Sequence, residues 1–170
     1  MLIFVVQGNI VRQPDCDAIV NSANQNLRAG SGVCGAIYRA AGPELEPNSI
    51  QLAPLALGAA VITPGFNLPN RYIIHTRGPR YFSDEDPPGN LEAAMRNTLL
   101  VAEQHMLSRI AVPAISMGIF AYPAEEAVPI LVQTARRVGN DLQHVRETRF
   151  VVTDGVLFKR LTDEVQKAQK

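Results

Sequence analysis

The stretch Ala18-Ile19-Val20-Asn21-Ser22-Ala23-Asn24-Gln25-Asn26-Leu27-Arg28-Ala29-Gly30-Ser31-Gly32-Val33-Cys34-Gly35 says most about how this chain folds. It begins with a short apolar run at 18–20, which is typical of a buried strand. It ends with three glycines within six residues, directly before a predicted helix at 36–41. Glycine lets the backbone approach a ligand, and a helix N-terminus offers unpaired N–H donors. The loop 24–35 is therefore predicted to form an anion cradle, although a glycine-rich turn without a ligand fits the spacing equally well.

Short apolar runs alternate with helical segments through the rest of the chain. We expect strands at 2–7, 18–21, 60–63, 71–76, 109–115 and 149–153, and the first of them should be buried on both faces. Further helices are expected after a cap at Asn90, from Pro123, where Pro129 should kink the helix or mark its true start, and from 156 to 168. This order predicts an α/β protein whose largely parallel sheet is covered on both faces.

The apolar positions of the helix after Asn90 follow a 3.6-residue period. They are Leu91, Ala94, Met95, Thr98, Leu99 and Ala102. The segment 83–90 before them has two prolines and three carboxylates and is predicted to be an exposed loop. With 170 residues and no linker-like segment, the chain is predicted to be one domain, 1–170.

Composition excludes several classes of function. Sixteen basic side chains balance sixteen acidic ones, which argues against nucleic acid as a partner, although backbone N–H groups can still bind a small anion. The apolar run at 2–7 is too short for a signal sequence, and no stretch approaches the roughly 20 apolar residues of a membrane span. We expect a cytoplasmic protein with reduced cysteines. Three scattered histidines predict no metal site.

Two loops should stand beyond the carboxyl ends of the strands, where α/β proteins bind ligands. They are 24–35, with Asn21 and Asn24 beside it, and 116–122. A carboxamide can donate to and accept from sugar hydroxyls, although asparagine in a loop is more often a turn former. In the second loop, Phe120 and Tyr122 could lie against a sugar or base, or could fill the core.

The glycines at 30, 32 and 35 also match the dinucleotide pattern Gly-x-Gly-x-x-Gly. That pattern should directly follow the first strand and precede an acidic residue by about 20 positions. Here a long asparagine-rich loop comes first, and Leu55 stands where the acid is expected. A dinucleotide oxidoreductase is therefore a third, disfavoured hypothesis.

Several blocks of the sequence, in order, resemble the macro domain family. They are Gln7-Gly8-Asn9-Ile10, Asp17-Ala18-Ile19-Val20-Asn21-Ser22-Ala23-Asn24, Gly30-Ser31-Gly32-Val33-Cys34-Gly35-Ala36-Ile37, His75-Thr76-Arg77-Gly78-Pro79 and Pro113-Ala114-Ile115-Ser116-Met117-Gly118-Ile119-Phe120. The resemblance covers nearly the whole chain. It implies a three-layer α/β/α sandwich around a mixed, mostly parallel sheet, with a deep cleft for ADP-ribose and no cofactor.

The resemblance also implies a set of ligand-binding residues. Amides of both loops would hold the pyrophosphate, Asn24 the distal ribose with support from Asn21, and Phe120 would cover that sugar. Asn9 and Ile10 would meet the adenine edge. The implied ligand-binding residues are Asn9, Ile10, Asn21, Asn24, Gly30, Ser31, Gly32, Val33, Cys34, Ser116, Met117, Gly118, Ile119 and Phe120. Asn24 and Cys34 are the candidate catalytic residues.

Four positions depart from the family pattern. Asn9 stands where many relatives carry Asp, and Cys34 where the best-known hydrolase branch has an Asp that helps to orient the attacking water. Tyr38 stands where that branch often has His, and Thr153 where some relatives have an aromatic against adenine. Asn9 keeps a carbonyl acceptor without the charge, so we expect weaker but retained binding. Cys34 cannot orient water as a carboxylate, and a nucleophilic thiolate there is a minor alternative. The leading hypothesis is a metal-independent hydrolase of ADP-ribose conjugates, and the alternative is a non-catalytic ADP-ribose reader.

Overall fold

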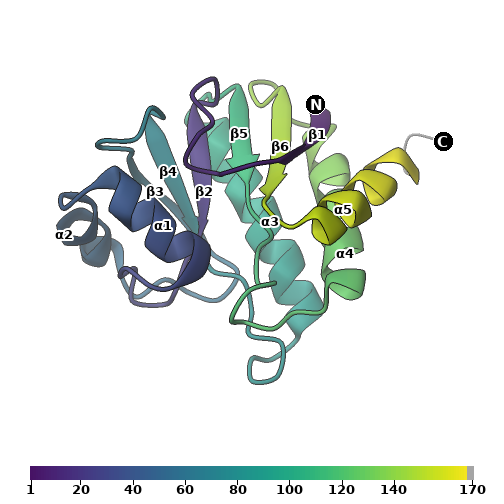
Figure 1. Cartoon of the computed structure of the whole chain (residues 1–170), viewed down its shortest axis with the longest axis horizontal. Helices are drawn as coiled ribbons and strands as arrows, with labels where there is room; N and C mark the ends of the chain where they lie inside the picture. The colour runs from purple at the N-terminus through teal and green to yellow at the C-terminus, as the bar shows by residue number, and fades with distance from the viewer. Residues whose placement is uncertain (168–170) are drawn as a thin grey trace.

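The computed structural model describes residues 1–167, and Figure 1 shows how its helices and strands are arranged. The strands are β1 (Leu2–Gln7), β2 (Ala18–Ser22), β3 (Ala60–Pro64), β4 (Tyr72–Thr76), β5 (Arg109–Val112) and β6 (Glu147–Val152). The helices are α1 (Gly32–Ala41), α2 (Leu45–Ser49), α3 (Pro87–Gln104), α4 (Ala124–Gly139) and α5 (Gly155–Lys167), with a 3-10 turn η1 (Ile50–Leu52).

The six strands form one mixed sheet in the order β1-β6-β5-β2-β4-β3. Every neighbouring pair is parallel except β3 and β4, whose antiparallel pairing is possible because only a short connection joins them. The prediction of a mixed, mostly parallel sheet is confirmed. The parallel strands bring the carboxyl ends of β1, β6, β5, β2 and β4 to one edge of the sheet.

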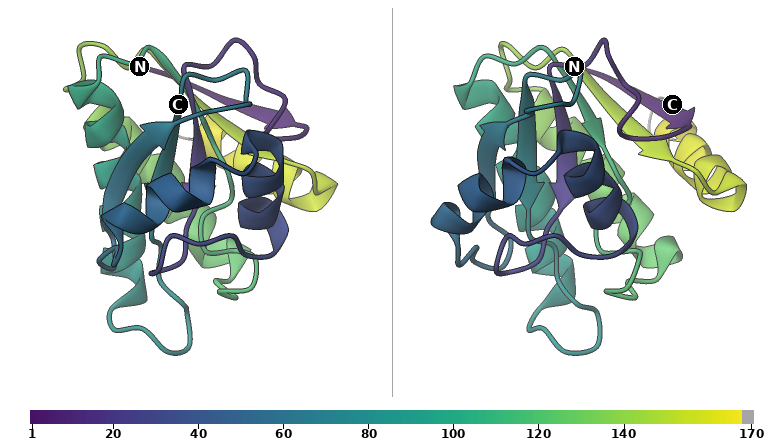
Figure 2. Two further views of the ribbon diagram at one scale, coloured as in Figure 1. Left: turned by 90° about the vertical axis from the view of Figure 1, so that its left-hand side faces the viewer. Right: turned by 60° about the vertical axis from the view of Figure 1, so that its left-hand side comes forward.

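Two hydrophobic cores lie on opposite faces of the sheet. One combines sheet residues with apolar side chains of α3, α4 and α5, and the other combines them with α1 and the start of α2. Figure 2 shows α1 on the other side of the sheet from α3 and α4. Helix α5 packs against α4 and the edge strand β1. The three-layer α/β/α sandwich is therefore confirmed.

Two predictions about burial have different outcomes. The apolar positions of α3, from Leu91 to Ala102, are all buried, so the helical period identified the core face correctly. The prediction that the first strand is buried on both faces is wrong. Strand β1 lies at the edge of the sheet, where Leu2 is 64% and Phe4 46% exposed, because within residues 1–167 only Ile3 and Val5 of positions 2–5 pack against a hydrophobic core.

Several predicted boundaries move. Helix α3 begins at Pro87 instead of after Asn90, because Asp86 caps it by accepting from Gly89 N at 3.2 Å and proline tolerates the first turn. Helix α4 begins after Pro123 and runs through Pro129, which is therefore not its start. The predicted end of the last helix, at position 168, lies outside the described residues. Helix α2 and η1 were not predicted.

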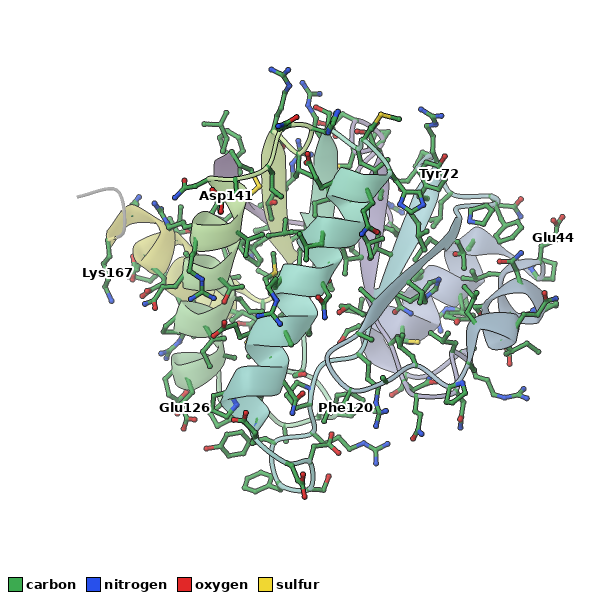
Figure 3. All side chains as sticks on the ribbon, turned by 180° about the vertical axis from the view of Figure 1, so that it is seen from behind. Glu44, Tyr72, Phe120, Glu126, Asp141 and Lys167 are labelled. Carbon is green, nitrogen blue, oxygen red and sulfur yellow. The ribbon has the colours of Figure 1, made fainter. Side chains whose placement is uncertain are left out.

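The two boundary shifts that matter for function lie at one end of the sheet. Helix α1 begins at Gly32, one turn earlier than predicted, so its N-terminus lies inside the glycine-rich loop. Strand β5 ends at Val112, which leaves 113–123 as a loop. Figure 3 shows Phe120 at one end of the molecule and Tyr72, at the start of β4, towards the other. Both loops therefore belong to the carboxyl edge of the sheet.

Candidate functional site

A cleft opens at the carboxyl edge of the sheet, between the loop that follows β2 and the loop that follows β5. It consists of two adjoining hollows, which we name after one lining residue each. The Asn24 hollow has a volume of about 180 Å³ and the Asn9 hollow one of about 430 Å³. They share Gly32, Val33, Pro113, Ala114 and Gly118, so they meet where α1 begins opposite the second loop.

The structure brings almost all of the predicted site residues to this cleft. The Asn24 hollow is lined by Asn24, Gly30, Ser31, Gly32, Val33, Cys34, Ser116, Gly118, Ile119 and Phe120 from the predicted set, and the Asn9 hollow by Asn9, Ile10 and Met117 as well. Asn21 lines neither hollow. Its side chain is fully buried behind the cleft, because Asn21 is still part of β2 and points into the α1 side of the sheet.

The first wall of the cleft is the N-terminus of α1. The amides of its first turn, at Gly32, Val33 and Cys34, have no intrahelical acceptor. Gly32 has φ +58°, and open space surrounds the position of a Cβ there. The helix dipole adds positive potential at this end. A helix N-terminus of this kind can hold an anion without any lysine or arginine, which suits a chain with no net charge.

The second wall is the loop 116–121, whose ends Ser116 and Ala121 both have positive φ, 65° and 58°. Non-glycine residues adopt this conformation only when their surroundings impose it. Here Tyr122 N donates to Ser116 O at 2.9 Å and Ala121 N to Gly118 O at 2.9 Å. Among the described residues no acceptor pairs with the amides of Gly118, Ile119 and Phe120. These amides form a second row of donors in the cleft.

The Asn24 side chain is partly occupied by its own loop. Its Nδ2 donates to Arg28 O at 2.8 Å and its Oδ1 accepts from Arg28 N at 3.1 Å. One N–H and one lone pair remain for a ligand. The backbone of this loop at Leu27 is fixed by two buried side chains, since the hydroxyls of Tyr38 and Ser49 donate to Leu27 O at 2.8 and 2.7 Å. Tyr38 is thus a buried support of the loop and does not line the cleft.

The Cys34 thiol is 8% exposed and donates to Arg28 O at 3.6 Å. Burial raises the pKa of Cys34, and hydrogen bonds from the Asn21 carboxamide and the Gly30 amide lower it less. The group is therefore a neutral thiol at pH 7. This protonation state argues against the alternative of a thiolate nucleophile.

Asn9 lies at the exposed edge of the larger hollow. Its Oδ1 accepts from Val11 N at 3.1 Å, so the backbone already uses one of the two lone pairs of the carbonyl expected to face a ligand. Among the described residues no acceptor pairs with the side-chain nitrogen, which remains a donor on an exposed residue. Thr153 and Asp154, which follow the neighbouring strand β6, also line this hollow, and Asp154 Oδ1 accepts from Leu157 N at 2.7 Å.

Comparison with known proteins identifies the family of this chain. The family model described as the macro domain matches residues 20–131. A macro domain-containing protein of Ralstonia nicotianae is 45% identical over 152 residues, which is 89% of each chain. The chain belongs to the macro domain family.

Two further relatives carry more specific names. A protein of Salmonella newport named O-acetyl-ADP-ribose deacetylase is 45% identical to this macro domain over 135 residues, 76% of this chain and 75% of that one. The solved structure of a mutant Oceanobacillus iheyensis macrodomain with ADPR (ADP-ribose) is 32% identical. It superimposes with a TM-score of 0.92 and covers 97% of this chain and 92% of its own.

The rim of the cleft in this macro domain is aromatic and partly apolar. Phe120 lines the Asn24 hollow with the Arg80 guanidinium 5.3 Å from its ring centroid, and Tyr81 N donates to Phe120 O at 3.0 Å. Ile119 beside it is 80% exposed. Tyr122, by contrast, is only 2% exposed, so of the two aromatics Tyr122 fills the core and Phe120 faces the cleft.

Some lining residues were not predicted from the sequence. They are Ser22, Pro113, Ala114, Gly8, Ala36, Val151, Val152, Asp154 and Leu157. Most of them are small or apolar and carry no chemical signature. Their only signal was position, because they lie at or just beyond the carboxyl ends of strands or near the starts of helices α1 and α5.

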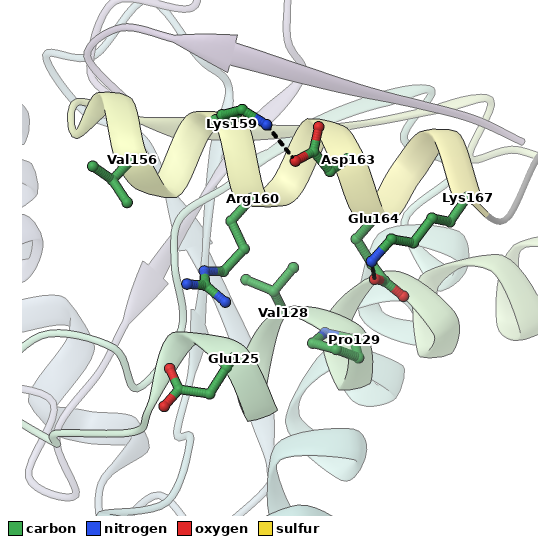
Figure 4. Close-up of a pocket in the computed structure, with 9 residues that line it drawn as sticks. All are labelled: Glu125, Val128, Pro129, Val156, Lys159, Arg160, Asp163, Glu164 and Lys167. Atoms are coloured by element: carbon green, nitrogen blue, oxygen red, sulfur yellow. Dashed lines mark hydrogen bonds and ion pairs between the residues drawn. The ribbon is translucent and has the colours of Figure 1, made fainter.

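A second groove lies away from the cleft, between α4 and α5 (Figure 4). Four of its charged side chains form ion pairs, Lys159 with Asp163 at 2.7 Å and Lys167 with Glu164 at 3.7 Å. It shares no lining residue with the cleft. No helix within 1–167 is long and apolar enough to cross a bilayer, and no cluster of His, Cys, Asp and Glu there could hold a metal ion.

Proposed function

We propose that this macro domain binds ADP-ribose and hydrolyses its conjugates, such as O-acetyl-ADP-ribose or ADP-ribosylated carboxylate side chains. One observation supports this most strongly. Two rows of unpaired amides, at the start of α1 and at Gly118 to Phe120, border the point where two hollows meet. Such a site suits a diphosphate with a group on each side.

The two hollows differ in the ligand group that each suits. The Asn9 hollow is larger and carries apolar side chains such as Ile10, Val33 and Leu157, which suits a nucleoside. The Asn24 hollow offers the remaining hydrogen-bonding capacity of Asn24 and the face of Phe120, which suits the second ribose. The relatives named above are consistent with this ligand.

The proposed reaction needs no cofactor. A water held by Asn24 and a ligand phosphate oxygen would attack either the ester carbonyl carbon or the anomeric carbon. The bond to the leaving oxygen breaks, and the leaving group takes up the proton that the water loses. In the ester reaction, charge develops on the carbonyl oxygen, and the unpaired amides that border the cleft would stabilise it.

The alternative is a reader that binds ADP-ribose without turnover. Cys34 favours it, because a neutral, buried thiol cannot accept a proton from water at pH 7 as a carboxylate could. Incubation with O-acetyl-ADP-ribose and with a protein ADP-ribosylated on carboxylates separates the two, with release of acetate or ADP-ribose as the readout. Binding without release over hours leaves the reader, and no binding of ADP-ribose refutes both.

A further inference from the structure

A ladder of buried polar side chains crosses three strands beneath α1. It consists of Thr63 in β3, His75 in β4 and Asn21 in β2, none more than 2% exposed. His75 Nε2 lies 2.9 Å from Thr63 Oγ1, and His75 Nδ1 lies 3.0 Å from Asn21 Nδ2. Asn21 and His75 are direct partners in the register of β2 and β4, so the sheet itself aligns them.

The hydrogen-bonding groups define one direction along this ladder. The Asn21 nitrogen can only donate, so His75 Nδ1 must accept and the ring proton must lie on Nε2. The Nε2–H then donates to Thr63 Oγ1, and the Thr63 hydroxyl donates to Pro64 O at 3.2 Å. Every donor along this path has an acceptor. Burial lowers the pKa of His75 to about 4, so the ring is neutral at pH 7.

The orientation of the Asn21 amide follows from which buried donors and acceptors have partners. As it stands, only its Oδ1 is buried without a partner. The reversed amide would bury two N–H donors at that position, and unpaired N–H groups are rarer in proteins than unpaired carbonyl oxygens. The amide therefore keeps its nitrogen toward His75.

The ladder reaches the cleft through Cys34. The Asn21 carboxamide and the Gly30 amide both lower the pKa of the Cys34 thiol, and a Cβ on Gly30 would lie 3.5 Å from the Cys34 sulfur, so the three residues are neighbours. The thiol in turn donates to Arg28 O, the atom that Asn24 also holds. Cys34, Gly30 and Asn24 all line the Asn24 hollow. His75 is thus linked to the wall of that hollow although it lines neither hollow itself.

We propose that His75 is a positioning residue, which fixes the Asn21 amide and thereby the Gly30, Cys34 and Asn24 wall around the second ribose. This inference rests on the proposed function. It assigns Cys34 a supporting part in place of a chemical one. It also gives Asn21 a part in the site from behind the cleft wall.

The first test is the proton position on His75, measured by the two ring ¹⁵N chemical shifts at pH 7. We expect the neutral ring with its proton on Nε2. A proton on Nδ1 would reverse the direction of the ladder and overturn the inference. This measurement is independent of whether ADP-ribose is the ligand.

The second test compares calorimetric affinities for ADP-ribose and ADP, because ADP lacks the ribose that the Asn24 hollow would hold. His75→Phe keeps a ring but removes both hydrogen bonds, and we expect ADP-ribose binding to weaken about tenfold and ADP binding much less. His75→Asn keeps an acceptor at the position of Nδ1 and should recover most of the loss. Thr98→Val, which deletes a buried hydroxyl that donates to Ala94 O on the other face of the sheet, is the matched control and should change neither affinity.

The outcomes separate this inference from the proposed function. If His75→Phe weakens the affinities for ADP-ribose and ADP equally, or changes neither affinity, the positioning role of His75 is overturned while ADP-ribose remains the ligand. If the wild type binds neither ligand, the proposed function fails, and the inference falls with it. Should His75→Phe not fold, Thr63→Val removes the far end of the ladder and is expected to lower the ADP-ribose affinity in the same selective way.

Discussion

The buried histidine gives this protein a specific dependence of stability on pH. Burial lowers the pKa of His75 to about 4 from an ordinary value of 6.5. The unfolded chain therefore binds a proton between pH 6.5 and 4 that the folded chain does not. Stability contributed by the neutral ring is fully present above pH 6.5 and is lost as the pH falls through 4. Protonation would also make Nδ1 a donor opposite the Asn21 N–H.

The size of the effect follows from the difference between the two pKa values. One pKa unit corresponds to 1.36 kcal/mol, so a shift of this size is equivalent to about 3 kcal/mol in the free energy of unfolding. Most of it should appear between pH 7 and 4.5. The carboxyl group of Glu103 affects stability at a lower pH than His75 does. Burial raises its pKa, but hydrogen bonds from the amides of Val145, Gln143 and His144 lower it more, to about 2.

Urea unfolding at pH 7.0 and pH 4.5, for wild type and His75→Phe, measures this contribution. We expect the wild type to lose about 2 to 3 kcal/mol more than the variant between the two values. The variant starts less stable, because it lacks two hydrogen bonds, but its stability should fall less with pH. Equal losses in the two proteins would show that His75 is not the group responsible and would refute the reasoning.

Three other substitutions test the cleft. Asn24→Ala removes both hydrogen bonds to Arg28, so calorimetry should show an affinity for ADP-ribose about tenfold lower and affinities for ADP and AMP that fall much less. Equal losses of affinity for all three ligands would contradict the assignment of the Asn24 hollow to the second ribose. In Gly35→Ala the new Cβ would collide with Gly30 O, so urea unfolding should show about 1 to 3 kcal/mol of destabilisation, and ADP-ribose binding should weaken. Gly155→Ala, whose Cβ would make only an ordinary contact with Gln7, is the control. Asn9→Asp keeps one oxygen for Val11 N and turns a second oxygen outward in place of the donor, so titration should show tighter ADP-ribose binding by a few-fold, and unchanged or weaker binding would count against adenine at that edge.

Much of the fold was predictable because it depends on local patterns. The apolar runs of β1, β2, β3 and β4 and the 3.6-residue period of α3 were visible in the sequence. The errors fell where local signals compete. Proline near a helix start was taken for loop at Pro87, although the missing N–H of proline costs nothing there. An apolar strand was taken for a central one, because composition alone does not distinguish a central strand from an edge strand that helix α5 covers on one face.

The sequence by itself determined the two loops that line the cleft. Their chemistry comes from glycines and from the N-terminus of α1, which are properties of neighbouring residues along the chain. Only the tertiary structure decided what supports them. The bonds of His75 to Asn21 and Thr63 join residues on three different strands, and the joining of the two hollows depends on α1 and the loop after β5 meeting across the sheet edge. Such contacts depend on strand order and register, which residue types and spacing leave open.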